Sequence, residues 1–386
     1  HRAEGRREDV GVRALDALTL LVELERPVGY LLQLLSHVSW YPVPRHAVEM
    51  HGAAWTEVGN LVTNGPFRLA AWKRGESLFL ARNPTYHGWP RVRGNVQQVN
   101  LFPLKDWSAR LQLYEADGLD VLGITFFPPA ERDNARQQHI GEYISSRRLE
   151  THFLAFDVRR PPFDDVRVRR AFALATDRET LADVVMRGYV APATGGLLPP
   201  GMPGHSPGIA LPYDPQQARR LLAEAGYPDG RGFPVVDALG FRAAESRSEY
   251  LQAHWRENLG IEIAWETVEW AEFLDRLGNE IPHLTSLGWV ADYPDPDSFL
   301  RVSRARSWAG WQNATYDRLV KEAGQVMCQG ERMKLYRQAD RILVEEAPIL
   351  PLIYERDHLL VKPWVSRYPL SAIKPSFWKD VVLELH

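Results

Sequence analysis

The chain has 386 residues, of which 45% are hydrophobic and 25% charged, a composition typical of a folded protein with more than one lobe. The 46 basic and 49 acidic residues give a formal net charge of −3, so no basic excess indicates nucleic-acid binding. The single cysteine, Cys328, excludes an internal disulfide framework and a zinc site built from cysteines. The longest apolar runs are short and interrupted by charges, so we expect no transmembrane helix.

The N-terminal part of the sequence predicts short strands and one short helix. Two strands are expected within 11–27, and an apolar helix within 28–37. Residues 64–86 alternate as a hairpin whose turn lies at 73–76. A further strand is expected at 96–104.

The middle of the chain carries the clearest helix signals. A strand at 151–158 leads to Asp164 and Asp165, which can cap a helix with a regular apolar face. Thr176 and Glu179 then match the T-x-x-E capping box of a second helix.

Strands and helices continue to alternate towards the C-terminus. Asp214 is the predicted cap of another helix, with proline at its first position. The remaining expected elements are helices near 246–258, from 270, near 314–325 and near 331–346, and strands at 261–268, 284–293 and 349–363. This alternation predicts an α/β protein with substantially parallel sheets.

Two short motifs suggest chemistry, but their contexts argue against it. "GHSPG" at 204–208 fits G-x-S-x-G, yet Ser206 lies in a Pro/Gly-rich loop instead of a strand–turn–helix elbow. "HAVEMH" nearly matches a metal-binding helix. His46 and His51 are five residues apart, however, so on a helix they point to different faces and do not chelate one ion.

The stretch "GWVADYPDPDSFL" at 288–300 gathers three carboxylates among prolines and aromatics. Its spacing is not that of a calcium loop, and the prolines favour turn or cap roles for Asp295 and Asp297. Asp292 differs, because it follows an apolar run and should lie at the end of a buried strand. A carboxylate there is expected to be either a socket for a cationic ligand or the partner of an internal Arg or Lys.

Longer segments along the chain resemble the bacterial family 5 extracellular solute-binding proteins, the peptide-binding components of ABC importers. The matching segments occur in family order and span nearly the whole chain: "VTNGPFRLAAWKRGESLFLARNPTYHG", "PPFDDVRVRRAFALATDRETL", "YDPQQARRLLAEAGYPDG", "HWRENLGIEI", "GWVADYPDPDSFL" and "ILPLIYERDHLLVKPWV". The oligopeptide-binding branch is the most similar.

The resemblance implies an α/β, two-lobed periplasmic-binding-protein type II fold, with a hinge between the lobes and an extra small domain on lobe I. It divides the chain into the remainder of the small domain (1–77), lobe I (78–181), lobe II (182–354) and a C-terminal return to lobe I (355–386). The family's first segment has no counterpart here, and the chain begins without methionine or a hydrophobic signal core. We therefore expect a mature, trimmed or fragmentary chain.

The resemblance also implies how a peptide would be held. In oligopeptide-binding relatives an aspartate in the "ADY" position pairs with the α-ammonium of the ligand, and Asp292 occupies that position. The backbone of Gly288, Trp289 and Val290 would pair with an extended peptide by β-augmentation.

Other positions match residues that line the pocket of relatives. They are Trp289, Trp270, Tyr354 and Asp157. At the position of Asp157, relatives often carry asparagine. For the two tryptophans, packing in the core is the competing interpretation.

The chain departs from long-peptide relatives where they place basic groups for the ligand's carboxylate. Ala244, Leu277 and Ser286 stand at those positions, with Arg242 and Arg276 as neighbouring substitutes.

The function implied is that of a periplasmic or extracellular, membrane-associated receptor, a monomer that closes on a peptide or another amine-bearing solute and delivers it to an ABC permease. No enzymatic activity, cofactor, metal or nucleic-acid partner is expected. The alternatives are another solute on the same fold, such as a nickel chelate, heme, an oligosaccharide or an opine, and the sensing domain of a transcriptional regulator.

Overall fold

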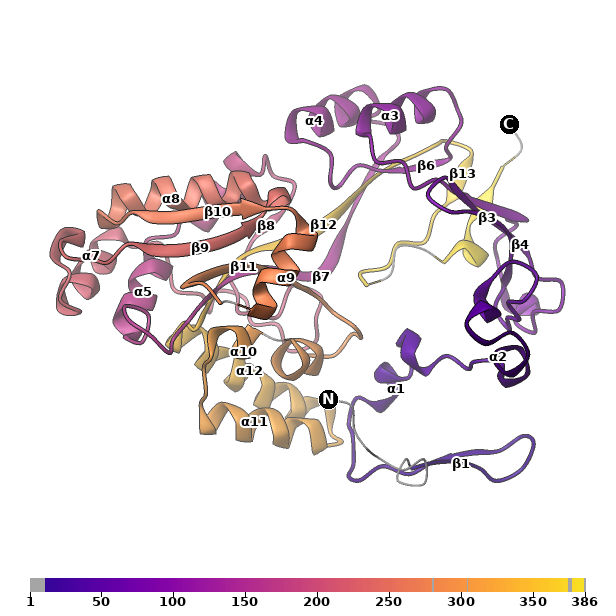
Figure 1. Ribbon diagram of the computed structural model, residues 1–386, viewed down its shortest axis with the longest axis horizontal. Coiled ribbons are helices and arrows are strands. Elements are labelled where there is room, and N and C mark those ends of the chain that lie inside the picture. Colours follow the sequence, from indigo (N-terminus) through magenta and orange to yellow (C-terminus); the bar gives the residue numbers. More distant parts are fainter. Residues whose placement is uncertain (1–10, 280, 304, 374–376, 385–386) are drawn as a thin grey trace.

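The computed structural model describes residues 11–279, 281–303, 305–373 and 377–384. Figure 1 shows a large α/β body and a second group of elements, connected by two long strands that run side by side, β7 (Tyr143–Phe156) and β12 (Ile349–Val361). The second group holds α3 (Trp107–Glu115), α4 (Pro129–Gln138) and the small β3–β4–β5 sheet.

The main sheet has the strand order β10-β9-β11-β7-β12-β6, with β8 paired to β12. The remaining bounds are β6 (Val121–Gly123), β8 (Ala191–Pro192), β9 (Val236–Phe241), β10 (Ile263–Val268) and β11 (Leu284–Val290). Among the described strands, parallel pairing occurs only between β9 and its two neighbours, β10 and β11, while β7 and β12 pair antiparallel with all of their partners. The prediction of mainly parallel sheets was therefore wrong, because the two long connecting strands run in opposite directions.

Helices cover both faces of this sheet. One core contains α5 (Val166–Leu174), α7 (Pro215–Glu224) and α8 (Glu245–Leu259). The other contains α9 (Trp270–Asn279), α10 (Ala305–Ala309), α11 (Ala314–Gln325) and α12 (Gln329–Glu346). Strand β7 contributes to both in alternation, since Leu154 and Phe156 lie in the first core while Phe153 and Ala155 lie in the second.

The second group of elements has its own small cores. The predicted hairpin is confirmed as β3 (Phe67–Lys73) and β4 (Ser77–Arg82), with β5 (Gln98–Leu101) on the other edge of β4.

The remaining short elements of the molecule are β1 (Val12–Ala14), β2 (Leu20–Val22), α1 (Leu31–Leu34), α2 (Arg45–His51), α6 (Arg178–Thr180), β13 (Val365–Arg367) and β14 (Val382–Leu383). Single turns of 3-10 or π-helix lie at Val38–Trp40, Gly52–Thr56, Trp89–Arg91, Leu181–Val185, Pro228–Gly230, Arg242–Ala244, Ser298–Val302 and Trp378–Asp380.

Two of the predicted helix caps are confirmed and one is wrong. Asp165 accepts a hydrogen bond from the backbone N–H of Arg167, and Asp214 caps α7 in the same way. The T-x-x-E box does not form, because Asp177 caps α6. Thr176 instead donates from its hydroxyl to the carbonyl of Phe172 in the preceding helix.

The predicted boundary between lobes at 181/182 falls inside one core. Leu181 and Ala182 are both fully buried there, together with Phe163, Leu222 and Trp255. Buried residues of 163–182 thus pack in the same core as those of 218–259. We propose that the chain instead passes between lobes along β7 and β12, the long strands that join the two groups in Figure 1.

Candidate ligand-binding site at the end of strand β11

One edge of β11 is open over most of its length. The strand pairs with β7 from Leu284 to Val290, but with β9 only at Leu284 and Thr285. Among the described residues, no strand covers the other edge of residues 286–290. Gly288, Trp289 and Val290 are only partly buried, so their backbone is open to pairing with an extended chain.

Asp292 lies just beyond this open edge. Its side chain is 37% exposed, and its Oδ1 lies 4.0 Å from Nε2 of His37. Within the described part of the chain, Asp292 has no Arg or Lys side chain within 4.0 Å. The alternative of an internal Arg or Lys partner is therefore wrong as far as the described residues go. Burial raises the pKa of Asp292, and the charge of His37 partly offsets that effect.

The other two carboxylates of this stretch are not simple turn residues. Asp295 does accept a hydrogen bond from the backbone N–H of Asp297, as a turn would predict. Yet both side chains are fully buried in ion pairs, Asp295 with Arg332 and Asp297 with Arg301. The hydroxyl of Tyr293 also donates to Asp297 at 2.7 Å. The turn role expected of Asp295 is thus confirmed by that bond, but each carboxylate is also the buried partner of a cation, which the sequence did not predict.

The two candidate tryptophans differ in burial. Trp289 is partly buried against the core, and its Nε1 donates to the Ser298 hydroxyl at 3.4 Å. That hydroxyl also accepts a hydrogen bond from the backbone N–H of Asp292 at 3.0 Å, so the Ser298 side chain is bonded to both candidate residues. Trp270 is 55% exposed at the start of α9 and packs against Phe241 at the end of β9. The core interpretation is therefore wrong for Trp270.

The last two predicted residues, Tyr354 and Asp157, are not placed beside Asp292 with a free polar group. The hydroxyl of Tyr354 is already bonded, and Asp157 lies at the far end of β11. Tyr354 is buried in β12, and its hydroxyl donates to the carbonyl of Gly196 at 2.9 Å. Asp157 pairs with Arg159 and Arg160 and lies beside the first residue of β11, whereas Asp292 follows the last. The six strand steps of about 3.3 Å from the first to the last residue of β11 alone span roughly 20 Å, and the two carboxylates lie beyond opposite ends of that span. Both assignments stay predictions.

The motifs set aside from sequence have the expected surroundings. Ser206 lies in a loop with no flanking strand or helix. His46 and His51 lie on α2, a short surface helix. Within the described ranges, no group of three or more His, Cys, Asp or Glu side chains is placed to hold a metal ion.

The sequence did not reveal a cluster of charges on β7 and β12, next to the paired edge of β11. In the pairing of β7 with β11, Glu150 lies opposite Val290 and His152 lies opposite Gly288. Nε2 of His152 is 3.0 Å from Glu150 and 3.5 Å from Glu355 of β12. The residues share one face of neighbouring strands, and only the strand register brings them together.

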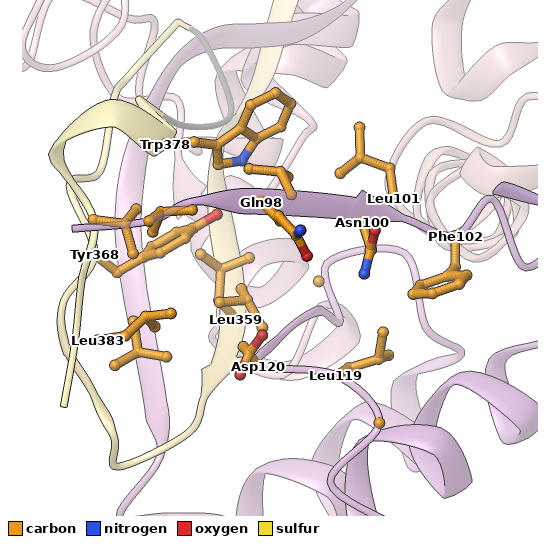
Figure 2. Close-up of a pocket in the computed structure, with 17 residues that line it drawn as sticks. Gln98, Asn100, Leu101, Phe102, Leu119, Asp120, Leu359, Tyr368, Trp378 and Leu383 are labelled. Atoms are coloured by element: carbon orange, nitrogen blue, oxygen red, sulfur yellow. The ribbon is translucent and has the colours of Figure 1, made fainter. Parts of the chain in front are cut away.

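A separate cavity of about 400 Å³ lies between β5 and β6. In Figure 2, Gln98 and Asn100 of β5 point towards Leu119 and Asp120, which precede β6. None of the seven predicted ligand residues lines it. Four of the seven, Gly288, Trp289, Val290 and Asp292, lie instead at the end of β11 with the open edge.

No helix among the described residues has the length and apolar character needed to cross a membrane. A family model described as bacterial extracellular solute-binding proteins, family 5, matches residues 3–311. The periplasmic oligopeptide-binding protein OppA of Escherichia coli is 31% identical over 93% of this chain and 67% of its own length. The probable deoxycholate-binding periplasmic protein YgiS of the same organism is 33% identical over 98% of this chain and 71% of its own length.

Solved structures agree with the two-lobed fold. The Escherichia coli murein tripeptide-binding protein MppA superposes with a TM-score of 0.81 at 26% identity, over 97% of this chain and 75% of that one. Haemophilus influenzae OppA in complex with the peptide RPPGFSPFR gives a TM-score of 0.77 at 25% identity, over 97% and 75%. The family consists of solute-binding proteins, not enzymes. With a two-lobed fold and a family match over most of its length, the chain belongs to the bacterial extracellular solute-binding proteins of family 5.

Proposed function

We propose that this protein is the peptide-binding component of an ABC importer, and that it works in the periplasm or at the cell surface. The observation that carries the proposal is the open backbone edge at residues 286–290, which ends beside the half-buried carboxylate of Asp292. Relatives named as oligopeptide-binding proteins, and one solved with a bound nonapeptide, support the same ligand class.

The chemistry of a free peptide fits this arrangement. Its main chain would add to the β11 edge by hydrogen bonds that do not depend on side chains. Its α-ammonium would reach Asp292, where a charge-assisted hydrogen bond is roughly twice as strong as a neutral one. Closure of the lobes would remove water from this pair and strengthen it. The closed protein would then present the peptide to a membrane permease.

The test is calorimetry with di- to pentapeptides, after native mass spectrometry has identified any peptide that co-purifies. Asp292→Ala should weaken binding of a free-amine peptide at least tenfold, about 1.4 kcal/mol. Asp275→Ala removes an exposed carboxylate from α9 and should leave the affinity unchanged. An N-acetylated peptide that binds as tightly as its free-amine form would rule out the ammonium socket.

A second ligand class is favoured by one specific relative. The 33% identical YgiS protein is named as a probable deoxycholate-binding protein, and deoxycholate carries a carboxylate but no ammonium. If this protein bound such a ligand, calorimetry would show deoxycholate binding that does not change in Asp292→Ala.

A further inference from the structure

Arg247 begins the buried stripe of helix α8. Leu251, Trp255 and Leu259 follow it at intervals of four residues and pack on the sheet. Arg247 is only 5% exposed, so it continues this stripe with a charged group. The helix follows β9 through one helical turn, which places its first residues at the carboxyl ends of the parallel strands β9, β10 and β11. Ligands of open α/β sheets bind at this edge.

The guanidinium of Arg247 has no partner among the described residues. The other four arginines that are buried within the described residues each donate at least one hydrogen bond to a carbonyl or a carboxylate; they are Arg132, Arg169, Arg178 and Arg332. Arg247 makes no such bond and no ion pair within the described part of the chain, and its Nε is buried without an acceptor. A buried N–H donor without an acceptor is costly, so the unpartnered Nε of Arg247 indicates a role outside the fold itself.

The nearest acidic side chains are already engaged elsewhere. Burial lowers the pKa of Arg247, and the charges of Glu355 and Glu150 offset this from a distance. Glu150 is paired with Arg148 and His152, both at 3.0 Å, and Glu355 lies 3.5 Å from His152. The negative charges of Glu150 and Glu355 favour the charged form of Arg247, but neither carboxylate accepts a hydrogen bond from it.

We infer that Arg247 receives a carboxylate of the ligand. The inference rests on the proposed peptide-binding function and narrows it. The ligand would carry an ammonium for Asp292 and a carboxylate for Arg247, either on a side chain or at the C-terminus. Residues paired directly across two strands lie on the same face of the sheet. Val290 therefore shares a face with Glu150, and Leu154 on that same face of β7 packs in one core with α8. Arg247 and the end of β11 thus lie on the same side of the sheet. A guanidinium can hold a carboxylate by two parallel hydrogen bonds, whereas the ammonium of lysine acts as a point charge.

The test compares ligands that differ in one carboxylate. Calorimetry would use the amidated peptides Ala-Glu-Ala and Ala-Gln-Ala for the side-chain source, and Ala-Gln-Ala with and without its C-terminal amide for the terminal source. Deoxycholate serves as a carboxylate without a peptide. In one of these comparisons the carboxylate form should bind the wild-type protein at least tenfold tighter than its neutral counterpart. That factor should fall close to one in Arg247→Leu and Arg247→Gln, and only partly in Arg247→Lys.

The control is Arg256→Gln, which removes the same charge from an exposed position on α8 and should keep the tenfold factor. Because Arg247 donates no hydrogen bond to the fold, Arg247→Leu should not lower the thermal unfolding midpoint of the ligand-free protein. A lower midpoint with an unchanged carboxylate factor would assign Arg247 a purely structural role and overturn the inference. If no peptide binds, the proposed function fails on its own, and the inference is then decided by whether Arg247→Leu weakens deoxycholate binding. Absence of binding to every carboxylate probe overturns it as well.

Discussion

Arg332 donates from one terminal nitrogen to both carboxylate oxygens of Asp295, at 2.9 and 3.0 Å, and both side chains are buried. Nε of the same arginine donates to the carbonyl of Ala323 at the end of α11. One guanidinium on α12 therefore fixes the segment after β11 to two helices. Asp292 lies three residues before Asp295, so this buried pair also positions the candidate ligand site.

Removing Asp295 should destabilise the protein strongly. Asp295→Ala leaves Arg332 buried without its counter-ion, and breaking one side of a buried pair typically costs about 3–5 kcal/mol of unfolding free energy. Denaturant unfolding measures the loss. Glu262→Ala is the control, because it breaks an exposed pair with Arg256 and should leave the unfolding curve nearly unchanged. Equal curves for the two variants would contradict the prediction.

Gly288 should not tolerate a side chain. A Cβ atom at this position would lie 2.9 Å from Nδ1 of His152, which is itself held by Glu150 and Glu355. We expect Gly288→Ala to lower the free energy of unfolding by about 1–3 kcal/mol, the range for overpacking a filled site. Gly278→Ala on α9 is the matched control, since a Cβ there meets open space, and it should be neutral or stabilise by up to about 1 kcal/mol. The ranking of the two variants in thermal unfolding decides the matter.

Local patterns in the sequence predicted local structure well. The hairpin at 67–82 and the caps Asp165 and Asp214 depend on alternation, turn residues and one side chain near a helix start, all readable within ten residues. The failures have tertiary causes. The ion pair of Asp295 was missed because its partner Arg332 lies 37 positions away along the chain. The mainly parallel sheet failed because strand direction depends on the whole path of the chain.

The candidate site was only partly within reach of the sequence. The end of an apolar run placed Asp292 at a strand end, and the resemblance gave it a role. The open edge of β11 and the cluster around Glu150 depend on strand register, which no short motif encodes. Arg247 had a readable signal, since the four-residue spacing to Leu251, Trp255 and Leu259 puts an arginine where the pattern requires an apolar residue.

Asp340 should make stability depend on pH. Its side chain is fully buried, and burial raises the pKa of Asp340 from 3.8 to about 6, although the backbone N–H of Leu197 donates to it. A raised pKa means that the folded state binds the proton more tightly than the unfolded state. The contribution of Asp340 to stability is therefore greatest below about pH 4 and is lost as the pH rises through 6, by about 3 kcal/mol in all.

Asp340→Asn isolates this effect, because an amide can still accept the Leu197 N–H but does not titrate. The unfolding free energy of the wild-type protein, relative to that of the variant, should fall between pH 4 and pH 6.5 and then level off. Denaturant titrations at intervals of pH measure the difference, and other carboxylates cancel because both proteins contain them. Parallel curves for the two proteins would exclude a titrating Asp340.

His37 should set the acid limit of ligand binding at Asp292. Only an ionised carboxylate attracts an ammonium strongly, so affinity for a free-amine peptide should weaken as the pH falls through the pKa of Asp292. Burial raises that pKa, and the charge of His37, 4.0 Å away, lowers it. His37→Asn removes the lowering charge, so the pKa of Asp292 should rise and the loss of affinity should begin at a higher pH. Calorimetry with one tripeptide from pH 3.5 to 7 measures this shift. The N-acetylated tripeptide should show neither the loss of affinity at low pH nor a change of its midpoint in His37→Asn. An acid limb that keeps its position in His37→Asn, or moves to lower pH, would show that His37 does not act on Asp292.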